Sequence, residues 1–160
     1  MKKFIGKFWN GLEIFDERFY KIEGEDIELC LIDIYEEKGE ALPFYWWDIV
    51  LKSENKAIGK ISFRIGSNYH SYYNGNIGYE IDEEYRGKNY SLSACRLVLP
   101  CAKFYKMDKI YLTCNSDNAA SCRTIEKLGA KLIEEVIPPK DYIYYFDGIK
   151  KHKIYELLIK

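Results

Sequence analysis

The spacing of apolar residues changes in the middle of the chain, and this change constrains the fold more than any other feature. Before it, three runs rich in Ile, Val and aromatic residues, each bounded by turn residues, predict strands at about 27–35, 44–51 and 57–65. From 90 to 107, apolar residues recur at helical spacing instead. A chain of this kind must pack a long amphipathic helix against a sheet.

The second half of the chain alternates between strands and helices. Asp117 or Asn118 is suited to begin a short helix that Gly129 ends, and Pro100 predicts a bend in the long helix because it removes one hydrogen bond. This order predicts a mixed α/β (α+β) sheet with a parallel crossover in its second half. The remaining expected elements are strands at 77–82, 109–114, 131–137 and 153–160, a short helix within 115–130, and loops at 66–76 and 138–152.

The length of 160 residues favours a single domain over 1–160, and 24 basic against 25 acidic residues favour no nucleic-acid partner. The N-terminal residues 1–16 are basic and then apolar, as in a signal peptide. However, Lys7, Asn10 and Glu13 interrupt this run, and no stretch approaches the ~20 apolar residues that span a bilayer. We therefore expect a cytoplasmic protein without a membrane partner.

The cysteine pattern favours buried free thiols in a reducing compartment over a disulfide or metal framework. The count is odd and no two cysteines have the CxxC spacing; the five are Cys30, Cys95, Cys101, Cys114 and Cys122. Only two histidines occur, so we expect no metal site.

A charged turn, "EIDEEYRGKNYS" at 80–91, connects the fourth expected strand to the long helix. The first N–H groups of a helix have no partner within the helix and lie at the positive end of its dipole. Gly87 permits close approach of a ligand, and Arg86 and Lys88 add positive charge. The turn therefore indicates a site for phosphate or pyrophosphate. The alternative is a surface loop whose basic side chains face water.

This turn and "NSDNAASCRTIEKLGA" at 115–130 resemble the two signature segments of the Gcn5-related N-acetyltransferase (GNAT) family, over about residues 57–137. In the first segment Arg86 matches the family pattern, Asn89 stands where a glycine is usual, and Ser91 takes the last small position. The second segment is matched by Asn115, Asn118, Ser121, Arg123 and the run from Glu126 to Gly129, with Ala130 where the family has Phe.

The resemblance implies a central mixed, mostly antiparallel sheet of about seven strands, flanked by helices, in which one parallel pair splays apart in the middle. It implies transfer of an acetyl group from acetyl-CoA to a primary amine of a small molecule or peptide, by direct attack on the thioester. The pantetheine arm would lie between the splayed strands. The residues implied in CoA binding are Ile81, Arg86, Gly87, Lys88, Asn89, Tyr90, Ser91, Asn115, Asn118 and Ser121; Arg123 and Lys127 either reach CoA or face water.

The resemblance also implies catalytic roles. Glu80, which alternation puts on one strand face with Asp82, is expected as the general base; an exposed carboxylate without a role is the alternative. A backbone N–H beside Ile81 would stabilise the developing oxyanion. Ile125 stands where the family usually has a tyrosine acid. The residues that could replace it are Tyr142, Tyr144, Tyr145 and Tyr111, and the sequence does not choose among them.

The acceptor is not identified by the sequence. The segment 36–50 reads as a hairpin, whereas the family usually has helices there. Aromatic loops at 68–76 and 141–148, with Trp46 and Trp47, frame the acceptor entrance or pack at sheet edges or a homodimer interface. His70 is a base or an ordinary loop residue. Two other functions stay open: a CoA- or acyl-CoA-binding module with little catalysis, and a partner-binding protein that holds no nucleotide.

Overall fold

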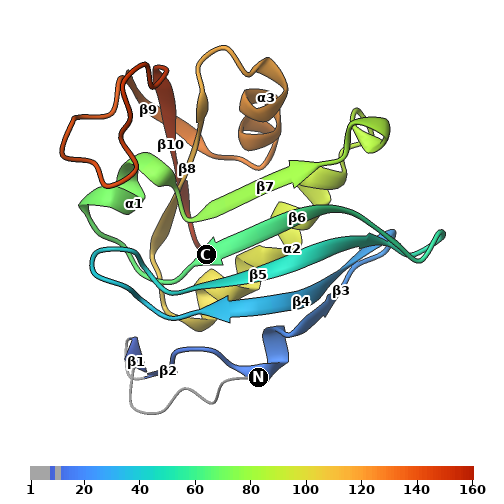
Figure 1. Cartoon of the computed structure of the whole chain (residues 1–160). Coiled ribbons are helices and arrows are strands. Elements are labelled where there is room, and N and C mark those ends of the chain that lie inside the picture. The colour runs from blue at the N-terminus through green and yellow to red at the C-terminus, as the bar shows by residue number, and fades with distance from the viewer. Residues whose placement is uncertain (1–7, 10–11) are drawn as a thin grey trace.

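The computed structural model describes residues 8–9 and 12–160 (Figure 1). Most of the basic and apolar N-terminal stretch, residues 1–7 and 10–11, therefore lies outside the described residues. Among the helices described, none combines the length and the hydrophobicity needed to cross a bilayer.

Two main antiparallel sheets, a small two-stranded one and three α-helices make up the described fold (Figure 1). The larger sheet has the order β3 (Lys21–Glu23), β4 (Ile27–Tyr35), β5 (Phe44–Leu51), β6 (Lys56–Arg64) and β7 (Ile77–Ile81). The smaller has the order β8 (Lys109–Asn115), β10 (His152–Leu158) and β9 (Lys131–Val136). The other elements are the helices α1 (Tyr69–Asn74), α2 (Tyr90–Phe104) and α3 (Ala119–Lys127), the hairpin of β1 (Phe8–Trp9) and β2 (Leu12–Glu13), and the 3-10 turns η1 (Glu17–Phe19) and η2 (Glu83–Tyr85). The mixed α/β fold with mostly antiparallel strands is confirmed.

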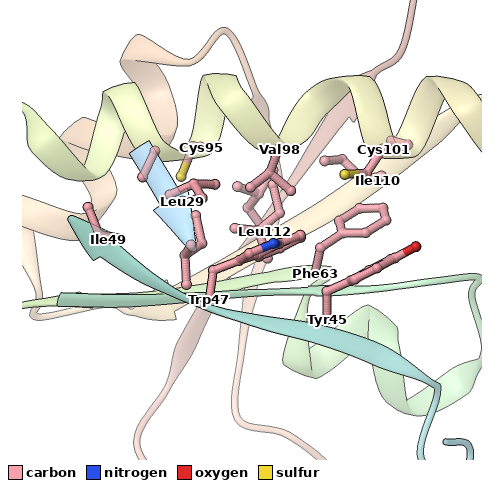
Figure 2. Close-up of a cluster of buried hydrophobic side chains, with 14 of the residues drawn as sticks. Leu29, Tyr45, Trp47, Ile49, Phe63, Cys95, Val98, Cys101, Ile110 and Leu112 are labelled. Atoms are coloured by element: carbon pink, nitrogen blue, oxygen red, sulfur yellow. The ribbon is translucent and has the colours of Figure 1, made fainter. Parts of the chain in front are cut away.

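The hydrophobic core lies between α2 and the larger sheet. Figure 2 shows Cys95, Val98 and Cys101 of α2 above aromatic side chains of the sheet, among them Tyr45 and Trp47. Trp47 is fully buried and donates its indole N–H to the Phe19 carbonyl at 2.7 Å. Of the two neighbouring tryptophans, Trp47 is therefore a core residue, as expected of buried indoles that find a partner.

The helix α2 continues through Pro100, which is exposed. The carbonyl of Arg96, which loses its helical partner to the proline, also lies on the exposed side, where water can satisfy it. The helix ends at Phe104, three residues before the expected end, because Lys106 takes a left-handed conformation with φ 57°.

One helix was not expected from the sequence. The segment 66–76 was predicted to be a loop, but it contains α1, and this part of the prediction is wrong. Asn68 caps α1 by accepting a hydrogen bond from the Ser71 N–H at 2.8 Å, and the Ser71 hydroxyl accepts one from the Asn68 N–H in return. The segment has no helical pattern of aliphatic residues, so the apolar spacing could not reveal it.

The connection from β4 to β5 is a hairpin loop at 36–43, as predicted. It leaves the face of the larger sheet opposite α2 without a covering helix among the described residues (Figure 1). Trp46 lies half-buried on that face, with the Lys60 ammonium 5.5 Å from its ring centre.

The strands β7 and β8 belong to different sheets but meet at one point. The Asn76 N–H, just before β7, donates to the Tyr111 carbonyl on β8 at 2.6 Å, and the Asn76 side-chain oxygen accepts from the Tyr111 N–H at 2.9 Å. Beyond this point the two strands diverge (Figure 1). The splayed pair therefore starts at Asn76.

Substituting Asn76 tests this junction. Asn76 is fully buried, and its side-chain amide also donates to the carbonyls of Arg64 at 3.0 Å and Gly66 at 2.8 Å. Asn76→Ala leaves one buried and two partly buried backbone groups without their partner, and each loss costs about 1–3 kcal/mol when the group is buried, so we expect a loss of roughly 2–4 kcal/mol in the free energy of unfolding. Asn74→Ala, two residues earlier, is expected to cost about 0.5 kcal/mol or less. Urea unfolding measures the free energy of unfolding of both variants. Equal losses in the two would contradict the role of Asn76 as the junction between β7 and β8.

Candidate functional site

A cleft of ≈540 Å³ opens between β7, the start of α2 and the exposed side of α3. It brings together residues from both signature segments, which lie about 30 residues apart in the sequence. The residues that line it are Tyr79, Glu80, Ile81, Tyr85, Arg86, Gly87, Asn89, Tyr90, Ser91, Asn118, Ala120, Ser121, Arg123, Thr124 and Lys127. Of the residues predicted to bind CoA, all but Lys88 and Asn115 line this cleft.

The turn before α2 has the backbone shape that an anion site needs. Gly87 has φ 81° and Asn89 has φ 61°, so both take left-handed conformations. Asn is the non-glycine residue that adopts this conformation most readily, which explains how it stands at a usual glycine position. The Asn89 side chain does not cap α2; instead it accepts from the Lys127 ammonium at 3.3 Å. The first N–H groups of α2 therefore stay without a side-chain cap from Asn89 and face the cleft.

Arg86 holds the turn in place. Its Nε–H donates to the Ile81 carbonyl at 2.8 Å, so the guanidinium bridges the end of β7 and the loop that follows. Lys88 is exposed next to the cleft. The positive charge at this rim thus comes from one side chain fixed by the backbone and one that faces water.

The edge of β7 that faces away from β6, here called its inner edge, carries backbone groups that no other strand pairs with. The Asp82 N–H donates to the Ile58 carbonyl of the β6 segment at 2.8 Å, and this bond sets the alternation along β7. The backbone of Glu80 therefore also bonds to β6, while the N–H and C=O groups of Tyr79 and Ile81 point to the other edge. Because β7 is the last strand of its sheet, that edge faces the cleft. An extended ligand can bind there as an added strand.

The side chains of Tyr79 and Ser121 meet across the cleft. Their hydroxyl oxygens lie 3.0 Å apart, and the Tyr79 hydroxyl is also 3.4 Å from the Ser121 carbonyl. Tyr79 is half-buried, and burial raises its pKa to about 12 although the hydrogen bond with Ser121 lowers it. The phenol therefore stays protonated throughout the physiological range.

Glu80 lies at the cleft rim with an exposed side chain. Strand alternation places it on the opposite face of β7 from Tyr79, so the two side chains approach the inner edge from opposite sides. A carboxylate and a phenol thus flank the same stretch of backbone.

Asn118 has the capping role that the sequence suggested. Its side-chain oxygen accepts from the Ser121 N–H at 3.1 Å at the start of α3, and it also lines the cleft. Asp117, the other predicted cap, instead pairs with Lys150 at 2.8 Å. Gly129, with φ 100°, follows the end of α3 as predicted.

The other predicted site residues lie in a different place. Asn115 lines a separate hollow of ≈370 Å³ with Tyr142 and Tyr144, formed by the loop before β10. Tyr145 donates its backbone N–H to the Tyr142 carbonyl in the same loop at 2.9 Å. Tyr111 packs edge-on against Tyr72 with ring centres 5.1 Å apart. None of these side chains lines the cleft between β7 and α3.

His70 is held by contacts at both ring nitrogens. Its Nδ1 accepts from the Ile143 N–H at 3.1 Å, and its Nε2 lies 2.5 Å from a carboxylate oxygen of Glu40. The ring is buried. Protonation of Nδ1 would place two donors against each other, so the geometry favours a structural tie between α1 and the loop before β10 over a base.

The cysteine thiols near the cleft are also buried. The Sγ atoms of Cys114 and Cys122 lie 2.8 Å apart between β8 and α3. Burial raises the pKa of the Cys114 thiol well above its ordinary value. A thiolate nucleophile is therefore disfavoured here.

Ile125, at the usual position of the family's tyrosine acid, is 1% exposed and belongs to the core. Sequence reasoning did not assign Tyr79 or Thr124 to the site, although both line the cleft. Tyr79 reads as a core-facing strand residue, and only its partner Ser121, 42 residues later, identifies its position at the cleft.

Comparisons with known proteins agree with this geometry. A family model described as acetyltransferase (GNAT) domain matches residues 16–131. No relative of the chain was found among curated proteins.

Several solved structures are similar to this chain. The acetyltransferase (GNAT family) from Bacillus anthracis is 24% identical with TM-score 0.58, over 71% of this chain and 65% of that one. The ribosomal-protein-S5-alanine acetyltransferase from Vibrio fischeri is 18% identical with TM-score 0.65, over 88% of this chain and 97% of that one. The microcin C7 self-immunity acetyltransferase, in complex with acetyl-CoA and AMP, is 21% identical with TM-score 0.56, over 72% and 61%.

The chain thus spans less than two thirds of the Bacillus anthracis and microcin-immunity proteins, but nearly all of the Vibrio fischeri enzyme. At these identities the likeness shows the fold alone.

Proposed function

This chain belongs to the acetyltransferase (GNAT) family, and we propose that it transfers an acetyl group from acetyl-CoA to a primary amine of a small molecule or peptide. The observation that carries the proposal is the cleft, in which an unpaired strand edge leads to an uncapped helix start. A long ligand with an amide-bearing arm and a pyrophosphate fits both features.

The chain offers binding groups in the order that such a ligand needs. The first N–H groups of α2 and the turn from Arg86 to Ser91 would hold the pyrophosphate. The free N–H of Ile81 and the free C=O of Tyr79 would bond the pantetheine amides, as in strand addition, while the C=O of Ile81 accepts from Arg86. Acetyl-CoA supplies the activated thioester, whose carbonyl carbon the amine attacks.

Glu80 is the proposed general base. Its exposed carboxylate lies on the open face of β7, where an amine can arrive from solvent. There it would take the proton that the amine must lose to become a nucleophile. The N–H of Tyr79, the next one on the inner edge of the strand beside Ile81, would donate to the carbonyl oxygen as negative charge develops.

No covalent enzyme intermediate is proposed. The thiols of Cys114 and Cys122 are buried and contact each other, and those of Cys95 and Cys101 are buried as well. Direct attack by the amine is therefore the route that the surroundings of the cleft favour.

The hollow formed by Asn115, Tyr142 and Tyr144 is the proposed entrance for the acceptor. The exposed aromatic side chains at this hollow, Tyr144 and Phe146, suit the apolar part of an amine or a short peptide. A peptide amine has additional support, because the similar Vibrio fischeri protein is named as a ribosomal-protein-S5-alanine acetyltransferase.

A CoA-binding module with little catalysis is the second candidate. The burial of Ile125 favours it, since the family's usual proton donor has no counterpart at that position. Both candidates bind CoA, so only turnover separates them.

The left-handed residue in the turn provides a test of the pyrophosphate site. Asn89→Val forces a β-branched residue into φ 61°, which is expected to cost about 1–2 kcal/mol of stability and to weaken acetyl-CoA binding. Asn55→Val is the matched control, because Asn55 has φ 49° in the β5–β6 turn and does not itself line the cleft. It should lose similar stability and bind acetyl-CoA normally. Calorimetric titration measures binding, and equal affinities in both variants would exclude this turn as the pyrophosphate site.

Substitution of Glu80 tests catalysis. Glu80→Gln keeps the side-chain shape but cannot accept the amine proton, so acetyl transfer should fall roughly 100-fold or more. The measurement is release of free CoA thiol with a panel of primary amines that includes a polyamine and a peptide with N-terminal alanine. Asp82→Asn, on the same strand face, is expected to retain activity.

Binding must be intact for this comparison. Acetyl-CoA at ~100 times its dissociation constant should raise the unfolding temperature of both proteins by roughly 5–10 °C. Turnover in the wild type that is unchanged in Glu80→Gln would rule out Glu80 as the base. Binding without turnover in the wild type would favour the CoA-binding module.

A further inference from the structure

A hollow of ≈280 Å³ lies at the end of the larger sheet, where the hairpin loop 36–43, α1 and the loop before β10 come together (Figure 1). Arg64, the last residue of β6, lines this hollow together with Phe44, His70 and Tyr144. We call it the Arg64 hollow, because Arg64 is the one permanent cation among the residues that line it. None of the functions proposed above uses this cation.

The Arg64 guanidinium is half-buried and lacks an acidic partner in the described part of the chain. Its Nη1 donates to the Gly75 carbonyl at 3.2 Å, and its central carbon lies 5.8 Å from the centre of the Phe44 ring. The titratable groups that act on it are the phenols of Tyr144 and Tyr142, and no carboxylate is among them. Burial lowers the pKa of the guanidinium, so its charge is poorly solvated. Buried charges in proteins are ordinarily paired, and this one lacks its anion.

The bond to Gly75 alone does not account for this arginine, since it uses one N–H of a guanidinium that has several. The guanidinium also lies next to Gly78 on β7, where a Cβ atom would be 3.7 Å from its Nη1. Because Gly78 has no side chain, the strand leaves space for a ligand beside the guanidinium.

Arg64 and Glu80 lie on the same face of the larger sheet. In the register of β6 and β7, Ser62 pairs with Gly78, and alternation places Arg64 on the face of Ser62 and Glu80 on the face of Gly78. The intervening Phe63 points the other way, into the core. This shared face has no covering helix among the described residues (Figure 1). Positions 78 and 80 are about 7 Å apart along the strand.

The Arg64 hollow adjoins the proposed acceptor entrance, because Tyr144 lines both. Tyr142, the other phenol that acts on Arg64, also lines the entrance. An acceptor at the entrance therefore has the guanidinium beside it.

The charges of the Arg64 hollow suit a carboxylate better than a phosphate or a polyamine. A guanidinium is planar and can bind a carboxylate with two parallel N–H groups. The hollow is also lined by Glu40, whose carboxylate would repel a dianion. The charge of Arg64 itself repels a second ammonium group on the acceptor.

We propose that Arg64 binds a carboxylate of the acceptor, which makes the acceptor an amino acid or short peptide whose carboxylate lies within about two residues, or ~7 Å, of its amine. In naming an acceptor, this inference rests on the proposed acetyl transfer. The amine faces Glu80 while the carboxylate lies against Arg64, next to Gly78. Arg64 binds and orients the acceptor and takes no part in proton transfer.

A matched pair of dipeptides tests this specificity in the full chain. The wild type should acetylate Ala-Gly with a kcat/KM at least about tenfold higher than that for Ala-Gly amide, which lacks the carboxylate. Arg64→Met should lower this ratio roughly 10- to 100-fold, because it removes a hydrogen-bonded charge pair, while kcat/KM for the amide stays within about threefold. The ratio cancels any difference in reactivity between the two amines.

Lys60→Met is the matched control. Lys60 is a second cation on the same face, but its ammonium is already paired with Asp48 at 3.2 Å, so the ratio should stay within about threefold of the wild-type value. If Arg64→Met slows both dipeptides equally, Arg64 only supports the Gly75 carbonyl and the proposal is overturned. A wild type that does not prefer Ala-Gly to its amide would overturn it as well.

Product binding provides a readout that needs neither turnover nor a variant. N-acetyl-Ala-Gly and its amide are titrated calorimetrically into the wild type with CoA bound, and binding of the amide should be at least about tenfold weaker. Equal affinities would contradict the carboxylate site even if Arg64→Met does not fold. If the wild type acetylates neither dipeptide but still prefers the product with the carboxylate, the proposed acetyl transfer fails and the carboxylate site stands.

Discussion

The site depends on the difference in hydrogen bonding between the two edges of β7. One edge is fully bonded to β6, while the other meets β8 only where Asn76 bonds to Tyr111. The two sheets therefore separate beyond this junction, and their divergence creates the cleft. Elsewhere in a folded protein an unpaired strand edge is a liability. Here α2 and α3 lie next to it, so the exposed backbone groups become binding groups for a ligand.

Strand alternation then places the functional side chains of β7 on opposite faces of the strand. In the account proposed here, Tyr79 points toward α3 and Glu80 toward the open face, while the backbone of Ile81 lies between them on the inner edge. The carboxylate of Glu80 and the phenol of Tyr79 thus stand on opposite sides of one strand.

The main strands, the long helix α2, the short helix α3 and the Asn118 cap could be predicted because each has a local signal of spacing or capping. The helix α1 could not, since its stability comes from the Asn68–Ser71 capping box and from packing of His70, not from a repeated apolar face. Likewise, Tyr79 reads as an ordinary core residue. Its place in the cleft depends on Ser121, a contact between distant segments that only the folded chain brings together.

The free edge of β7 is the central claim, and NMR-detected hydrogen exchange with and without acetyl-CoA tests it most directly. The account predicts that acetyl-CoA slows exchange at the amides of Tyr79 and Ile81. The amides of Gly78 and Glu80, already bonded to β6, should change little and serve as internal controls. Exchange at Tyr79 and Ile81 that stays unchanged in the presence of bound acetyl-CoA would contradict the account.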